Sequence, residues 1–334
     1  MKTVYFYEAF EEEAACLRSY LPAEMTAEFS EKTIQELDSR EPPAEIVSVR
    51  TQSIIPPEWA GKVKAILART TGYDHMQAYR RLTDSDVPCG HLPLYCARAV
   101  AEQAMLLWTA LIRKLPLQQA QFEGFNRDGL TGRECQGKNL LVVGVGNIGH
   151  EVVSIATALG MNVSGVDIVP KHADVQYVDF EGALAHADIL VCAMNLTADN
   201  RRYFNYEMLR SCKPGLIFVN VSRGECSPAV DLVRLIEAGC LGAVGLDVYD
   251  NEPALAVSAR SRDAGHRDAD RGEQQDDPEK QAVKRLAGMS NVILTPHNAF
   301  NTEEAVERKS EQSVTQITTF LATGSFKWPV PVER

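Results

Sequence analysis

Short apolar runs alternate with longer amphipathic segments through the first hundred residues of the chain. Residues 4–7, 46–49 and 65–68 are apolar runs of strand length, and residues 11–21 have the length and spacing of a helix. Such alternation is typical of α/β proteins, in which helices cover a parallel sheet. The sequence therefore predicts an α/β unit here, although this part contains no glycine-rich phosphate loop.

The alternation of strand and helix becomes stricter in the middle of the chain. Residues 140–145 and 162–166 are predicted strands on either side of a helix at 148–159. Further apolar strands are predicted at 189–193, 216–220, 243–247 and 292–295. A helix predicted at 97–115 is apolar nearly all round, so we expect both of its sides to be covered. A last helix is predicted at 302–321.

One segment interrupts this pattern. Residues 258–284 are about half charged and contain almost no large apolar side chain. Such a segment cannot bury enough apolar surface to order itself. We therefore expect a solvent-exposed, mobile insertion at 258–284.

Composition narrows the classes of protein to consider. A chain of 334 residues suits two domains, and its 45% hydrophobic and 24% charged residues are those of a globular protein. The net charge of -11 disfavours nucleic acid or an anionic membrane surface as a partner. The N-terminus lacks the apolar core of a signal peptide, and no apolar run approaches the roughly 18 residues that span a bilayer. We expect a cytoplasmic protein.

The cysteines do not suggest a metal centre. The eight cysteines form no C-x-x-C pair, and none lies at zinc-ligand spacing from a histidine. We therefore predict reduced, mostly buried thiols and no metal site.

A G-x-G-x-x-G sequence follows the predicted strand at 140–145 and opens the next helix, which is the context of a dinucleotide fingerprint. Gly144 would permit the tight turn, Gly146 the close approach of a diphosphate, and Gly149 the packing of helix on strand. With Asn147 and Ile148 these residues begin the helix, whose amides would face the phosphate charge. The alternative to a binding site is a glycine-rich turn that holds no ligand.

An acidic residue ends the next predicted strand. Asp167 lies 18 residues after Gly149, where its carboxylate would accept hydrogen bonds from the adenosine ribose and repel a 2'-phosphate. This favours NAD over NADP. The fingerprint alone leaves FAD and other dinucleotides open, because they share it.

Three residues that follow predicted strands would suit the reduction of a carbonyl group by a bound nicotinamide cofactor. Transfer of hydride to a carbonyl carbon requires a proton for the oxygen, and His297, after a buried strand, is the predicted donor. Glu252 follows the neighbouring strand and would orient the imidazole. Arg223 follows a third strand, where its guanidinium would hold the substrate carboxylate and carbonyl oxygen. The alternative for His297 is a purely structural role. For Glu252 it is a charge at a helix N-terminus, and for Arg223 it is a surface ion pair.

These residues lie in sequences that resemble motifs of the D-isomer-specific 2-hydroxyacid dehydrogenases. The matching sequences are RTTGYD at 69–74, LPLYCARAVAE at 92–102, VSRGE at 221–225, GLDVYDNEP at 245–253 and TPHNAF at 295–300. They occur in the family's order and span nearly the whole chain. The resemblance implies an NAD-dependent oxidoreductase.

The resemblance also assigns substrate and cofactor contacts. Backbone amides near Thr71 and Gly72 would bind the substrate carboxylate, and Asp247 would contact the nicotinamide side of the cofactor. Tyr95 matches a tyrosine of the D-lactate dehydrogenase branch that reaches the substrate, although core packing is an equal alternative for this residue. TPHNAF also looks more like that branch, whereas Cys96 replaces its usual serine.

The family implies two doubly wound, Rossmann-like α/β domains. Residues 1–97 and 300–334 would form a flavodoxin-like substrate-binding lobe, and residues 98–299 the NAD-binding Rossmann lobe with its charged insertion. The family also implies a homodimer built on the apolar helix at 97–115.

The predicted function is reversible hydride transfer between NADH and a small 2-keto acid such as pyruvate, with a D-hydroxy acid as the product. The substrate within this class is left open, because pocket size depends on side chains from both lobes. The alternative from another class is a non-catalytic, NAD(H)-sensing regulatory protein on the same fold.

Overall fold

Every apolar run predicted as a strand lies in one of two parallel sheets. The computed structural model describes residues 2–252, 254–255 and 277–332. The chain divides into two units: Met1–Cys96 with Asn301–Arg334, and Ala97–Phe300. We call them the first and the second unit. The two parallel sheets of five and six strands confirm the predicted α/β fold class with two doubly wound domains.

The sheet of the first unit has the strand order β2-β1-β3-β4-β5, and all its strand pairs are parallel. Its strands are β1 (Lys2–Phe6), β2 (Ala27–Phe29), β3 (Ala44–Val49), β4 (Ala65–Ala68) and β5 (Cys89–Gly90). This order, 2-1-3-4-5, is the flavodoxin-like arrangement that was predicted. The strands β2 and β5 were not predicted, because runs of three and two residues give no periodic signal.

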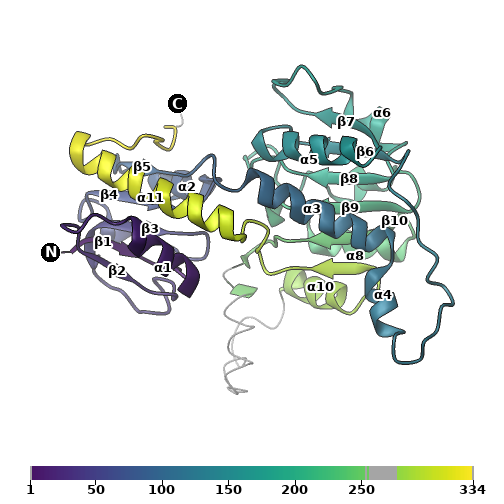
Figure 1. Cartoon of the computed structure of the whole chain (residues 1–334), viewed down its shortest axis with the longest axis horizontal. Coiled ribbons are helices and arrows are strands. Elements are labelled where there is room, and N and C mark those ends of the chain that lie inside the picture. Colours follow the sequence, from purple (N-terminus) through teal and green to yellow (C-terminus); the bar gives the residue numbers. More distant parts are fainter. Residues whose placement is uncertain (1, 253, 256–276, 333–334) are drawn as a thin grey trace. The chain divides into compact units, whose positions relative to one another are not determined.

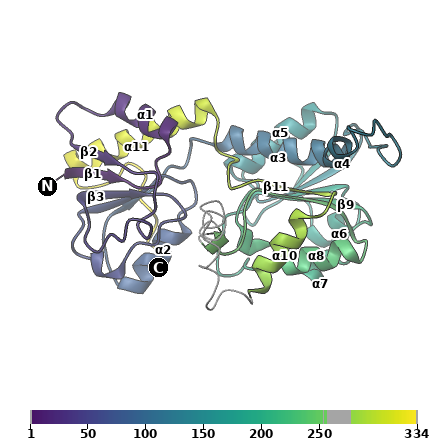
Figure 2. The same cartoon turned by 90° about the horizontal axis from the view of Figure 1, so that it is seen from below.

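Helices cover both faces of this sheet. Helices α1 (Glu11–Tyr20) and α11 (Glu303–Thr323) pack against each other on one face, and α2 (Asp74–Thr83) with the short helix η1 (Pro57–Trp59) lies on the other (Figure 2). Trp59 is fully buried between η1 and the sheet. The last helix of the chain thus completes the unit that begins at the N-terminus (Figure 1).

Three charged side chains among the described residues of the first unit are fully buried. The side chains of Glu13 on α1, Arg69 after β4 and Lys309 on α11 are all 0% exposed. Glu13 Oε1 lies 2.8 Å from Arg69 Nε and 2.9 Å from Lys309 Nζ. Burial opposes the charge on Glu13, but the two cations outweigh it and lower the pKa of its carboxyl to about 2. We call these three residues the buried ionic cluster.

The sheet of the second unit has the order β11-β10-β9-β8-β6-β7 and is also parallel throughout. Its strands are β6 (Asn139–Val143), β7 (Asn162–Val166), β8 (Ile189–Cys192), β9 (Leu216–Asn220), β10 (Leu241–Leu246) and β11 (Val292–Leu294). The chain reverses its winding direction between β6 and β8, which is where ligands bind in sheets of this type.

Helices also cover both faces of the second sheet, as Figure 2 shows. The helices on one side are α3 (Ala97–Ile112) and α5 (Asn147–Ala158), and those on the other side include α6 (Phe180–Leu184), α7 (Tyr206–Leu209), α8 (Ala229–Glu237) and α10 (Pro278–Ala287). A short helix, α4 (Leu115–Ala120), follows α3. Helix α3 packs closely on β10, because a Cβ added at Gly245 would lie 3.1 Å from Leu107. Within one chain Leu106 on α3 is 53% exposed, so the expectation that both sides of this helix are covered stays a prediction.

The predicted mobile insertion is partly wrong. Residues 278–284 lie in α10, with Lys280 and Ala282 buried. The helix begins because the Asp277 side chain accepts a hydrogen bond from the Glu279 amide and Pro278 occupies the first helical position. The segment was predicted to be mobile because of its high charge content, and the capping signal at Asp277 and Pro278 was overlooked. The rest of the predicted insertion, up to residue 276, lies outside the described residues.

Candidate active site

Arg223, Glu252 and His297 follow three neighbouring strands of the second unit. Strands β9, β10 and β11 are adjacent and parallel, and their last residues are in register with one another. The carboxyl ends of parallel strands meet at one edge of the sheet, where ligands bind in open α/β sheets. The topology therefore brings all three predicted catalytic residues to the same edge.

His297 and Glu252 form a direct hydrogen bond. His297 Nδ1 lies 2.6 Å from Glu252 Oε2, and the two side chains are 21% and 15% exposed. The other carboxylate oxygen of Glu252 accepts a hydrogen bond from the Tyr249 amide at 3.1 Å. Glu252 is thus fixed from one side and holds the imidazole from the other.

The loop that carries His297 is held by a buried carboxylate. Asp247 is 1% exposed; its Oδ1 accepts hydrogen bonds from Thr295 Oγ1 at 2.5 Å and the Asn298 amide at 2.9 Å, and its Oδ2 from the Ala299 amide at 2.9 Å. His297 itself adopts a left-handed conformation with φ 51. Burial raises the pKa of Asp247, against the opposing effect of these hydrogen bonds. Sequence reasoning assigned Asp247 to the cofactor and missed that it shapes the histidine loop.

A glycine lets the arginine loop lie directly on the loop that precedes Glu252. A Cβ added at Gly224 would lie 1.8 Å from the Tyr249 carbonyl carbon and 2.2 Å from the Asp250 nitrogen. Arg223 itself is held by its backbone carbonyl, which accepts from Asn220 Nδ2 at 2.9 Å. No side chain other than hydrogen fits at position 224 without moving backbone.

The fingerprint glycines have the geometry of a diphosphate cradle. Gly144 has φ 89, and a Cβ there would lie 2.4 Å from Met194 Cα in the loop after β8. A Cβ at Gly149 would lie 2.0 Å from the Gly144 carbonyl oxygen, so α5 packs tightly on the turn. A Cβ at Gly146, in contrast, would meet nothing within 4 Å. The open space is thus above Gly146, where a diphosphate would approach the first amides of α5 at Asn147.

Asp167 lies next to this turn and has a role that the sequence did not predict. Its Oδ2 accepts a hydrogen bond from the Val145 amide at 2.7 Å, and its Oδ1 accepts one from the Val169 amide at 2.9 Å. The carboxylate therefore joins the end of β7 to the glycine turn. Each oxygen keeps a lone pair for a ribose hydroxyl, so the arrangement fits an adenosine diol.

The predicted substrate-binding residues of the first unit lie close together. Thr71 Oγ1 is 3.3 Å from Cys96 Sγ and 3.2 Å from the Leu92 carbonyl oxygen. Gly72 is in the same loop and accepts a hydrogen bond from the Thr70 hydroxyl. Tyr95 is next to Cys96 and is buried, which raises the pKa of its phenol well above the usual value. Thr71 and Tyr95 thus both lie next to Cys96, Thr71 in space and Tyr95 in the chain.

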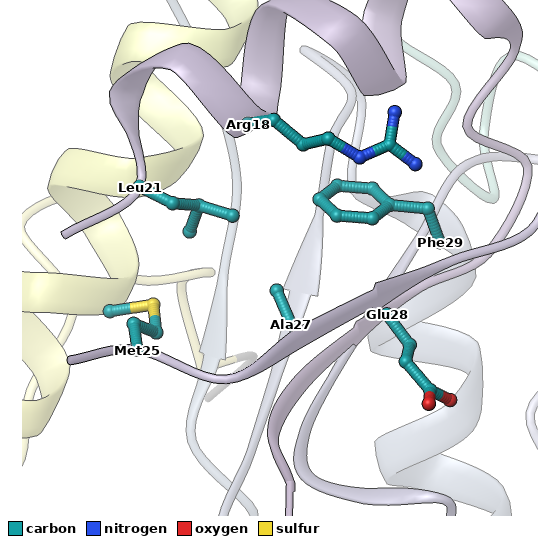
Figure 3. Close-up of a pocket in the computed structure, with 6 residues that line it drawn as sticks. All are labelled: Arg18, Leu21, Met25, Ala27, Glu28 and Phe29. Carbon is teal, nitrogen blue, oxygen red and sulfur yellow. The ribbon is translucent and has the colours of Figure 1, made fainter. Parts of the chain in front are cut away.

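A surface cavity of the first unit involves none of the predicted site residues. It has a volume of about 430 Å³ and lies between α1 and the edge strand β2 (Figure 3). On the wall of this cavity, the Arg18 guanidinium lies 4.5 Å above the ring of Phe29.

The helices of the described residues include none with the length and apolar character of a membrane-spanning segment.

Comparison with known proteins identifies the family of the chain. Residues 104–299 match the family model of the D-isomer specific 2-hydroxyacid dehydrogenase NAD binding domain. The chain belongs to the D-isomer specific 2-hydroxyacid dehydrogenases. This 2-hydroxyacid dehydrogenase is therefore an NAD-dependent oxidoreductase, which confirms the predicted cofactor and enzyme class.

Curated relatives of the dehydrogenase differ in their substrates. It is 30% identical to the D-lactate dehydrogenase of Escherichia coli, with 75% of this chain and 74% of that protein covered. It is 29% identical to the hydroxypyruvate reductase of Thermotoga maritima, with 88% and 90% covered. The fold is that of the Aquifex aeolicus D-lactate dehydrogenase complexed with NAD and lactic acid, with a TM-score of 0.82, 24% identity, and 97% and 99% of the two chains covered.

Proposed function

We propose that this dehydrogenase reduces a small 2-keto acid such as pyruvate to the D-hydroxy acid, and catalyses the reverse reaction. The observation that carries the proposal is the 2.6 Å hydrogen bond between His297 Nδ1 and Glu252, at the edge of the sheet to which Arg223 also belongs. Several relatives named D-lactate dehydrogenase support a pyruvate-sized substrate.

His297 is the proposed proton donor and acceptor. Bound NADH supplies the hydride to the carbonyl carbon. Because Nδ1 is engaged by Glu252, Nε2 is the ring nitrogen that gives a proton to the carbonyl oxygen during reduction and takes it back during oxidation. Glu252 orients the ring, and its negative charge stabilises the imidazolium that oxidation produces.

Arg223 is the proposed anion-binding residue. Its planar guanidinium has donors for the substrate carboxylate and for the carbonyl oxygen, which becomes negative as hydride arrives. Backbone amides at Thr71 and Gly72 are proposed to bind the same carboxylate, and Tyr95 to contact the substrate. Cys96, which touches the Thr71 hydroxyl, is then in a position to influence which side chain the keto acid carries.

The experiment that tests these roles compares His297→Gln and Arg223→Gln with matched surface variants. His186→Gln and Arg210→Gln are suitable controls, because both residues are exposed and the ion pair of Arg210 is with Glu207 on α7. We expect kcat to fall about 10³-fold in the first pair, since a general acid or a charge-stabilising donor contributes effects of this size. NADH affinity, measured by fluorescence titration, stays unchanged in all four. Retained turnover in both site variants would refute the assigned roles.

A panel of 2-keto acids assayed with NADH and with NADPH, followed by chiral analysis of the product, tests the substrate. The expected result is preference for pyruvate-sized acids with NADH and a D-configured product. NADH binding without turnover of any acid on the panel would instead favour the NAD(H)-sensing alternative.

We also propose a homodimer. Leu106 on α3 is 53% exposed, and Phe122 and Phe125, which follow α4, are 73% and 75% exposed. A second copy of the chain would cover them. Light scattering should then give twice the 36.8 kDa chain mass, and Leu106→Glu should shift it toward one chain. A wild-type mass of one chain at micromolar concentration would exclude the dimer.

A further inference from the structure

Two histidines and an aspartate that the proposed reaction does not use lie together in the second unit. His150 is on α5, one residue after the last fingerprint glycine. His172 and Asp174 are in the segment between β7 and α6, more than 20 residues later in the sequence. This spacing resembles no metal-binding motif, so the cluster could not be predicted from the sequence.

The three side chains face one another. His150 Nε2 lies 2.9 Å from Asp174 Oδ2, and the rings of His150 and His172 are stacked with centroids 4.0 Å apart. One potential ligand atom from each residue lies within 4.8 Å of the other two. Zinc holds imidazole nitrogen and carboxylate oxygen at about 2.0–2.2 Å in a tetrahedral arrangement, so ligand atoms on a common ion are about 3.4 Å apart. The His150 and Asp174 ligand atoms, 2.9 Å apart, need only separate slightly to admit an ion between them.

The third ligand needs only a side-chain rotation. The two rings are nearly parallel, at 11°, so their lone pairs do not yet converge on one point. His172 is in a loop and half-buried, and Asp174 has a 67% exposed side chain. A tilt of the His172 ring out of the stack would turn its nitrogen toward the other two ligand atoms, which already lie within 4.8 Å of it.

We propose that His150, His172 and Asp174 bind one divalent transition-metal ion, of the class of Zn²⁺, Co²⁺ or Ni²⁺. Two imidazoles with one carboxylate suit these ions, whereas Mg²⁺ and Ca²⁺ prefer oxygen ligands only. Three protein ligands leave a further coordination position to water. The site is separate from the proposed catalytic residues, which follow strands β9 to β11.

A bound ion would fasten the loop after β7 to α5. The same loop begins with Asp167, whose carboxylate accepts hydrogen bonds from the Val145 and Val169 amides. The ion would thus add a second attachment between this loop and the region of the fingerprint. Because the ion binds the folded chain, saturating metal should raise the Tm of the protein by several degrees.

Cobalt titration of the tag-free, chelator-treated full chain tests the site. Visible absorption of Co²⁺ reports imidazole and carboxylate ligation, while a near-ultraviolet charge-transfer band would report thiolate ligands from the cysteines. The variants are His172→Ala and Asp174→Asn, with His186→Ala as the control, because His186 is an exposed histidine outside the cluster. NADH binding by each variant checks that the second unit is folded.

We expect one equivalent of Co²⁺ to bind the wild type and His186→Ala with equal affinity and to raise the Tm of both. In His172→Ala and Asp174→Asn, removal of a ligand should weaken binding at least about tenfold. Equal affinity in all four proteins, a thiolate band in the wild type, or no binding at all would overturn the proposal.

Discussion

Two neighbouring glycines of the fingerprint should respond to the same substitution in opposite ways. At Gly146 a Cβ meets nothing within 4 Å, and the backbone there has φ -83 and ψ -153, which alanine adopts without strain. At Gly149 a Cβ would lie 2.0 Å from the Gly144 carbonyl oxygen, although real Cβ contacts do not fall below 3.0 Å. Gly149→Ala therefore requires a shift of about 1 Å between α5 and the turn.

These geometries set the expected magnitudes. For Gly146→Ala, the small loss at a helix N-cap and the gain from a less flexible unfolded chain nearly cancel, so unfolding free energy should change by less than about 0.5 kcal/mol. Its methyl group occupies the space through which the diphosphate approaches, so NADH affinity should fall at least about tenfold, or 1.4 kcal/mol. For Gly149→Ala, a backbone clash in a packed contact should cost at least about 2 kcal/mol and lower the Tm by about 5 °C or more.

The assay measures both properties in both variants. Thermal unfolding without cofactor reports stability, and fluorescence titration with NADH reports affinity. Wild-type NADH affinity in Gly146→Ala would show that the diphosphate does not cross above this glycine. Wild-type stability in Gly149→Ala would show that the close packing of α5 on the turn is not required.

Two further predictions concern the arginine loop and the buried ionic cluster. Gly224→Ala should reduce kcat at least about tenfold, because its Cβ would collide with the backbone at Tyr249 and displace the arginine loop. NADH affinity should stay within about twofold of the wild type. An unchanged kcat would contradict the close contact between the two loops. The Glu13 carboxyl has a pKa of about 2 in the folded chain and an ordinary pKa of 4.5 in the unfolded chain. Its contribution of about 3 kcal/mol to stability is therefore complete above pH 4.5 and is lost as pH falls toward 2. Urea unfolding of Glu13→Gln and wild type should therefore differ by about 1 kcal/mol less at pH 3.5 than at pH 6, and a difference independent of pH would mean that this carboxyl is not held ionised.

Much of the second unit could be predicted from the sequence, because its strands are continuous apolar runs and its fingerprint is local. Residues 216–220 were predicted as a strand with the same bounds that the structure shows for β9. The bounds are clear in the sequence because a strand that is buried on both faces is a continuous apolar run. The order of strands that brings Arg223 and His297 to the same edge of the sheet is a non-local property, and it was predicted only from the family resemblance and the general behaviour of parallel sheets.

Other features could not be predicted because they depend on contacts rather than on patterns. Asp247 and Asp167 were assigned to the cofactor, yet each also holds a loop through backbone amides that no sequence pattern reveals. The start of α10 at Asp277 and Pro278 was overlooked because charge content outweighed a local capping signal. Lys309 reads as a surface residue of a helix, and only the return of α11 to the first unit shows that it is fully buried beside Glu13.

The buried ionic cluster also bears on how the chain matures during synthesis. Glu13 and Arg69 leave the ribosome early, but Lys309 and the rest of α11 emerge only after the whole second unit has been made. Until then α1 lacks the helix against which it packs. The second unit has its complete set of strands earlier, so the part of the protein translated first is the part that finishes folding last.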